Sequence, residues 1–437
     1  MMAASISVPL LGIVDTAILG HLDSPAYLAA VNVGSSAMNL LIWGFGFLRM
    51  STVGLVAQAD GANNKILRSE HLIRALTVAL ALGMLVVSTQ RLWLPWLMAL
   101  LADGSSSVAL AQDYLDIRLW SVPFHLLLFV INGYFLAVGR VSRVLYLTLV
   151  GQLVNMLLNY LLVMVYHLDV RGVAWGSLIS QCLAASMGIY WLLKERHLNL
   201  TQWVNVTSWW QRAHLWALFH LNKNVFIRTL CLMTVFALMT RFSAQQGTLT
   251  LAVNALLLNF FYLTSYALDG YAHAIESISG RLFGQRDWQA LKMATTSVVK
   301  ISWLVAVAIS LLFWLSGEFI VNLLTDLPAV RRSAYDYLVW CYLLPIIAML
   351  GFVYDGLCVG ITASKVMRDA MLIATFLVFI PAWYGSGWLL PQANLENHRL
   401  WAAFSLFFLA RGLLMRSMYR RHYLGYDPSY RATGFTK

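Results

Sequence analysis

The stretch ISWLVAVAISLLFWLSG, residues 301–317, contains no charged side chain. A helix that crosses the hydrocarbon core of a bilayer needs about 20 mainly apolar residues, so this stretch predicts a membrane span. Reading outward from it, comparable apolar runs recur along the whole chain. They predict twelve spans, near 3–20, 26–50, 72–94, 115–139, 144–166, 172–193, 224–245, 250–277, 297–317, 335–361, 367–390 and 400–419.

Composition supports an all-α membrane protein. Hydrophobic residues make up 60% of the chain and charged residues only 11%, whereas soluble domains carry roughly 25% charged residues. Runs of this length predict helices, because the strands of a membrane barrel are about ten residues long and alternate in polarity. The four cysteines lie in apolar runs without CxxC spacing and predict buried thiols: Cys182, Cys231, Cys341 and Cys358.

The formal net charge of +11 has a membrane explanation. Basic residues gather in every second loop, as after the second span (Lys65, Arg68) and the fourth (Arg140, Arg143), and again in the tail. Positive residues favour the cytoplasmic side, so we expect both termini in the cytoplasm and no nucleic-acid partner.

The segment RLWLPWLMALL, residues 91–101, predicts a separate interfacial helix.

The chain repeats itself. AAVN at 29–32 matches LAVN at 251–254, DYLDIRLWSVP at 113–123 matches DYLVWCYLLP at 336–345, and Asn132-Gly133 matches Asp355-Gly356. The two members of each match are separated by nearly the same number of residues. We call the separation between Asn132 and Asp355 the repeat offset. Six spans per half predict two six-helix bundles related by a pseudo-two-fold axis along the membrane normal, suited to alternating access. We expect an N-lobe at 1–194, a cytoplasmic linker at 195–222, a C-lobe at 223–419 and a basic tail at 420–437, in a monomer.

One carboxyl lies in the first predicted span. Asp15, in SVPLLGIVDTAILGHL, has no basic residue within a helical turn, and an ionised group in mid-membrane costs about 2.5–3.5 kcal/mol on insertion scales. The sequence therefore predicts a proton-coupling acid, with an aspartate that serves only packing as the alternative. Asn155 and Asn159 are one turn apart on the fifth span, where they would line a polar cavity or join helices by hydrogen bonds.

The second half carries further polar candidates. Asp269, His273 and Glu276 are spaced to share one stripe of the eighth span, and this stripe suggests a proton or ion path, a cavity lining or a helix end in water. A metal site would need ligands from a second helix, which the sequence does not supply, so we expect no bound metal. Asp355 lies on the tenth span at the repeat position of the neutral Asn132.

Three strings resemble a known family: VPLLGIVDTAILGHLDSPAYLAAVNVG, FLRMSTVGLVAQADGA and YALDGYAHAIESISGRLFGQRD. They are similar to the multidrug and toxic compound extrusion (MATE) transporters, and within these to the DinF subfamily. The resemblance implies two six-helix lobes in a V that export amphipathic, often cationic, compounds in exchange for protons or sodium ions. The resemblance implies that Asp15 corresponds to the family's proton-coupling aspartate and that Asp355 corresponds to a C-lobe acid linked to cation coupling.

The resemblance also implies a polar N-lobe cluster of Asn132, Asn155, Asn159 and Ser177. Subfamily members usually carry an aspartate where this chain has Asn159, so the N-lobe coupling here depends on Asp15 alone. We expect a proton-coupled exporter of a bacterial inner membrane without a cofactor, with sodium less favoured. The alternatives are a lipid-linked oligosaccharide flippase, which would need a basic cavity where the interior charges here are mostly acidic, and an intramembrane transferase.

Overall fold

The structure is a computed structural model that describes residues 25–101, 107–195, 212–389 and 395–422. Eleven helical stretches in these ranges are long and apolar enough to cross a membrane. Some of them join consecutive elements, as α2 (Pro25–Gly44) with α3 (Phe47–Gly61). The eleven stretches coincide with the predicted spans two to twelve, so the all-α polytopic architecture is confirmed. The first predicted span, 3–20, lies outside the described residues.

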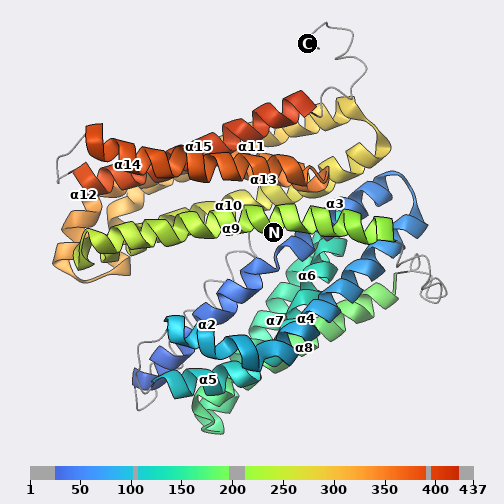
Figure 1. Cartoon of the computed structure of the whole chain (residues 1–437), viewed down its shortest axis with the longest axis horizontal. Coiled ribbons are helices and arrows are strands. Elements are labelled where there is room, and N and C mark those ends of the chain that lie inside the picture. Colours follow the sequence, from blue (N-terminus) through green and yellow to red (C-terminus); the bar gives the residue numbers. More distant parts are fainter. Residues whose placement is uncertain (1–24, 102–106, 196–211, 390–394, 423–437) are drawn as a thin grey trace, which may run out of the picture. The chain divides into compact units, whose positions relative to one another are not determined.

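The chain divides into two compact units, residues 1–219 and 220–437, called here the first and second unit. Figure 1 shows the helices of each. The first unit contains α2 (Pro25–Gly44), α3 (Phe47–Gly61), α4 (Lys65–Leu101), α5 (Ser107–Arg118), the 3₁₀ turn η1 (Leu119–Ser121), α6 (Val122–Ala137), α7 (Val141–Tyr160), the π-helical turn η2 (Leu161–Val165) and α8 (Asp169–Leu193).

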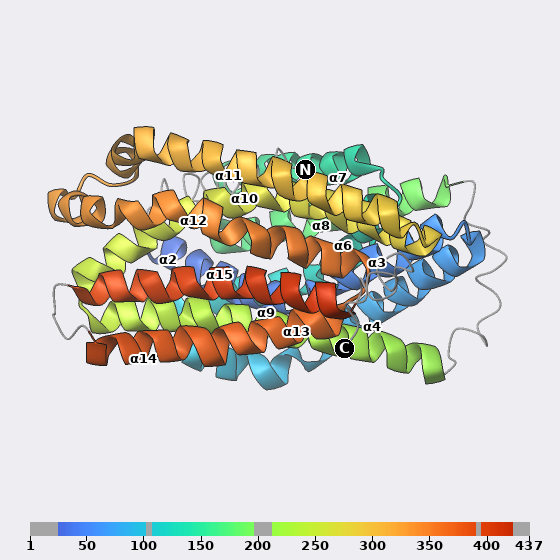
Figure 2. The same cartoon turned by 90° about the horizontal axis from the view of Figure 1, so that it is seen from above.

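The second unit is also helical. It contains α9 (Arg212–Gln245) from residue 220 onward, α10 (Thr248–Gln285), α11 (Trp288–Leu324), α12 (Pro328–Gly360), α13 (Ser364–Leu372), the π-helical segment η5 (Ile373–Phe379), α14 (Ile380–Leu389) and α15 (Glu396–His422). Helix α12 packs against α10, α11 and α15 and forms the centre of this unit (Figure 2). Its aromatic core includes Phe260, Trp401, Phe404 and Phe408, each almost fully buried.

Two local expectations differ from the structure. Residues 91–101 continue α4 past Pro95 and do not form a separate helix, because no glycine or proline lies between Gly83 and Pro95 to end the helix. Helix α9 begins at Arg212, so the last part of the predicted linker, 212–222, is helical.

Two pairs of turns show the internal repeat in the backbone. Asn63 follows α3 with a left-handed φ of 52°, and Arg286 follows α10 with a φ of 59°. Gly139 follows α6 with a φ of 75°, and Thr362 follows α12 with a φ of 56°. The members of each pair are separated by the repeat offset, so helices in the two units end in the same left-handed turn even where the residue types differ.

Two glycines show the same repeat in the packing. A Cβ on Gly133 would lie 2.9 Å from the backbone oxygen of Arg49 on α3, and a Cβ on Gly356 would lie 2.3 Å from that of Ala272 on α10. The repeat offset separates Arg49 from Ala272 just as it separates the two glycines. Small residues let the backbones of membrane helices approach closely, and here they bring α6 onto α3 and α12 onto α10.

Replacing Gly356 by alanine should separate α10 from α12, because its new methyl group would overlap a backbone oxygen that cannot move alone. Overpacking of this kind costs about 1–3 kcal/mol, so the midpoint of thermal unfolding in detergent should fall. Gly385→Ala is the matched control, since nothing lies within 4 Å of a Cβ there. Equal midpoints for the two variants would contradict the close helix contact.

Candidate functional site

Four polar side chains form a buried cluster between α7 and α8 in the first unit. The Nδ2 of Asn155 donates to the Oγ of Ser177 at 3.1 Å and approaches the Oγ of Ser180 at 3.4 Å. The Nδ2 of Asn159 donates to the Oδ1 of Asn155 at 3.2 Å. All four residues are at most 7% exposed. The structure thus brings together Asn155, Asn159 and Ser177 as the sequence suggested, and adds Ser180.

A glycine makes room for this cluster. A Cβ on Gly176 of α8 would lie 2.1 Å from the Oδ1 of Asn159, so only glycine admits that amide between the helices. Directly after Asn159, α7 gives way at Tyr160 to the π-helical turn η2. Single π-helical turns are frequent at functional sites. The local backbone is therefore shaped around the Asn159 side chain.

The two remaining N-lobe candidates are placed differently. Asn132 lies on α6, and its buried Oδ1 has no hydrogen-bond partner among the described residues. It is not joined to the Asn155 cluster by a hydrogen bond within that part of the chain. Asp15 lies outside the described residues.

In the second unit, Asp355 of α12 is held by two buried arginines. Arg228 of α9 donates its Nη2 to the Oδ2 of Asp355, and the Nη2 of Arg411 of α15 lies 3.1 Å from the same oxygen. Both arginines are at most 7% exposed. We name Arg228, Asp355 and Arg411 the buried triad. Its arginines add two buried positive charges that the expectation of a mostly acidic interior did not include.

The stripe on α10 also has basic partners. The Nδ1 of His273 lies 3.3 Å from the Oε1 of Glu276, which is buried. Asp269 interacts electrostatically with Arg411 of the buried triad. His273 and Glu276 are therefore paired along α10, and Asp269 lies one turn before them on the same helix.

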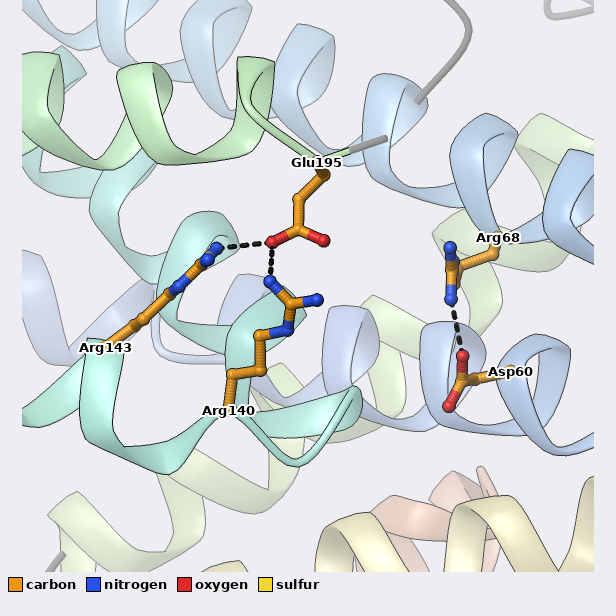
Figure 3. A network of polar contacts seen from close by, with 5 residues as sticks. All are labelled: Asp60, Arg68, Arg140, Arg143 and Glu195. Carbon is orange, nitrogen blue, oxygen red and sulfur yellow. Dashed lines mark hydrogen bonds and ion pairs between the residues drawn. The ribbon is translucent and has the colours of Figure 1, made fainter. Parts of the chain in front are cut away.

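A second ionic network lies at the helix ends that are predicted to face the cytoplasm (Figure 3). Glu195, just after α8, accepts hydrogen bonds from Arg140 and Arg143 at one carboxylate oxygen. The Nη1 of Arg68 on α4 donates to the Oδ1 of Asp60 on α3 at 2.6 Å. Only the arginines of this network were expected from the sequence, as loop charges. The first contact ties the end of α8 to the start of α7, and the second ties α3 to α4.

An apolar groove of about 580 Å³ lies on the outer side of α8, lined by Trp120, Phe124, Trp175, Ile179, Cys182 and neighbouring residues. At about 100° per residue, its α8 side chains point away from Ser177 and Ser180. Several of them are half-exposed. The groove is therefore separate from the polar cluster.

Comparison with known proteins places this geometry in a family. The family model described as MatE matches residues 1–161 and 225–384. DNA damage-inducible protein F of Escherichia coli (strain K12) is 34% identical over 430 residues, which cover 97% of this chain and 90% of that protein. A probable multidrug resistance protein NorM of Rhizobium meliloti (strain 1021) is 24% identical over 348 residues, covering 78% of this chain and 73% of the relative.

A solved structure has the same fold. It is described as the outward-facing conformation of a multidrug resistance MATE family transporter of the MOP superfamily. The TM-score is 0.87 at 18% identity, and the match covers 98% of this chain and 94% of that chain. At this identity the likeness establishes the fold.

Glu195→Gln should destabilise the first unit, because Arg140 and Arg143 would lose the buried negative charge that they share. Hydrogen bonds to charged groups contribute about 1.5–3 kcal/mol each, and the partial exposure of both arginines reduces the loss, so we expect about 1–3 kcal/mol in total. Asp326→Asn is the matched control, because the Asp326–Arg331 pair has a fully exposed carboxylate and such pairs contribute little. The midpoint of thermal unfolding reports both, and an unchanged midpoint for Glu195→Gln would refute the stabilising role.

Proposed function

We infer that this chain, which belongs to the MatE family, is a multi-pass multidrug efflux transporter. The observation that carries this inference is the family match across both units, together with relatives named for multidrug resistance and multidrug export. We propose that it works in a bacterial inner membrane with both termini in the cytoplasm. Its substrates are amphipathic or cationic compounds, which it moves by alternating access between its two six-helix halves.

We further propose that protons drive export and that Asp15 carries them. Among the other intramembrane acids, Asp355 is held by two arginines, Asp269 interacts with Arg411, and Glu276 pairs with His273. A carboxylate held by guanidinium groups is a poor proton carrier, because the adjacent positive charges stabilise its ionised form. This favours Asp15 over Asp355 as the coupling acid.

The hydrogen-bond chain in the first unit suggests how protonation acts. Asn159 donates to Asn155, which donates to Ser177. An ionised carboxylate can only accept hydrogen bonds, whereas a protonated carboxylic acid also donates one. When Asp15 takes up a proton from outside, the amides of Asn155 and Asn159 would have to rotate to offer an oxygen. We propose that this rearrangement bends the first span and expels the substrate from the first unit.

Asp15→Asn should abolish drug export while leaving the protein level unchanged, because asparagine has the size of aspartate and cannot exchange a proton. Efflux of a fluorescent cationic dye from drug-sensitive bacteria, with membrane protein quantified in parallel, measures both. Asp326→Asn, at an exposed position, should export like the wild type. Full drug resistance in cells that carry Asp15→Asn would remove this mechanism.

Gly176→Ala should lower export at least tenfold, because the new methyl group would displace the amide of Asn159 from the cluster. Gly151→Ala is the matched control on the facing helix α7, since a Cβ there meets only the Cβ of Ala184 at 3.4 Å. Both variants are assayed for dye efflux at equal membrane level. Wild-type efflux by Gly176→Ala would show that the position of Asn159 is irrelevant to transport.

A further inference from the structure

The repeat allows the buried triad to be compared with its counterpart in the first unit. Asp355 corresponds to Asn132, and the same repeat offset relates Arg411 to Gly188. The structure supports this pairing. A Cβ on Gly188 would meet the side chain of Ile131 at 3.0 Å, beside Asn132, and Arg411 reaches Asp355 from the equivalent helix. An Asp–Arg pair in one unit thus replaces an Asn–Gly pair in the other.

The guanidinium of Arg411 fills space that is built for it. Its Cδ lies 3.6 Å from the position of a Cβ on Gly351, and its Cζ lies 5.8 Å from the ring centre of Phe352. A cation over an aromatic face is attracted by the ring. Arg411 is 2% exposed, so its charge lies in the interior of the unit. Its ion-pair partner there is Asp355.

The buried triad contains two positive charges, on Arg228 and Arg411, and one negative charge, on Asp355. Both guanidiniums converge on a single oxygen of Asp355, its Oδ2. A buried carboxylate requires either such a partner or a bound ion. Here the partner is covalently part of the chain.

We propose that Arg228 and Arg411 are tethered counter-ions that occupy the place of a free monovalent cation at Asp355, so that removing Arg411 creates a site for one. Asp355 then binds no exchangeable cation in the natural protein. For transport, this rests on the proposed function and removes Asp355 as a site of ion coupling. The binding itself is independent of export, because it is measured without drug or gradient.

The test uses the purified full chain and its variant Arg411→Ala, in which alanine removes the guanidinium but keeps a strong helix former. The midpoint of thermal unfolding is measured in choline chloride, with sodium chloride or low millimolar guanidinium chloride as the added probe. The wild type should not respond to either cation. Arg411→Ala should start lower and rise by several degrees with saturation as sodium or guanidinium is added, since a ligand that binds only the folded state stabilises it.

Two controls assign that response. Arg411→Lys keeps a tethered charge and should not respond, and the double variant Asp355→Asn/Arg411→Ala lacks the carboxylate and should lose the response. A sodium response in the wild type that Asp355→Asn abolishes would overturn the proposal, as would an Arg411→Ala protein that responds to neither cation.

A third comparison covers the case in which Arg411→Ala does not fold. The double variant Asp355→Asn/Arg411→Ala should then be more stable than Asp355→Asn alone, because the single change leaves two buried guanidiniums without their carboxylate. Lower or equal stability of the double variant would overturn the proposal. These stability measurements test only the tethered counter-ions, so a negative result does not argue against drug export. A protein that fails to export drugs, in turn, does not argue against the tethered counter-ions.

Discussion

The hydrocarbon core of a bilayer cannot solvate polar groups, so each polar side chain placed there must find its partner within the protein. Both units contain neutral polar clusters, with Asn155 and Ser177 in the first and Asn254 and Asn397 in the second. The second unit adds a cluster of full charges around Asp355. Neutral groups rotate and exchange hydrogen bonds at little cost, whereas a buried ion pair is expensive to break.

This difference suggests that the two halves, although built alike, have different roles in transport. The turns at Asn63 and Arg286 and the contacts of Gly133 and Gly356 occur at one offset, so the scaffold is shared. The charged cluster around Asp355 has no counterpart at Asn132. We expect the first unit to change its hydrogen bonds during transport and the second unit to keep its ion pairs.

Much of this could be predicted from the sequence. Apolar runs identified every described span, because the length of a membrane helix is imposed by the bilayer. The spacing of Asn155 and Asn159 placed them on one face, because helix geometry is local. Arg228 and Arg411 were missed, since each lies in an apolar span, far along the chain from Asp355. Pairing over such separations depends on the tertiary fold, and only the cost of an isolated intramembrane arginine could have indicated it.

Transport into vesicles under a single imposed gradient decides whether protons drive export. The protein is reconstituted, and uptake of a fluorescent cationic dye is followed with either a pH gradient or a sodium gradient as the only driving force. A proton-coupled exporter with a neutralised Asp355 should accumulate dye under the pH gradient and not under the sodium gradient. Accumulation driven by sodium alone, at constant pH, would contradict the account.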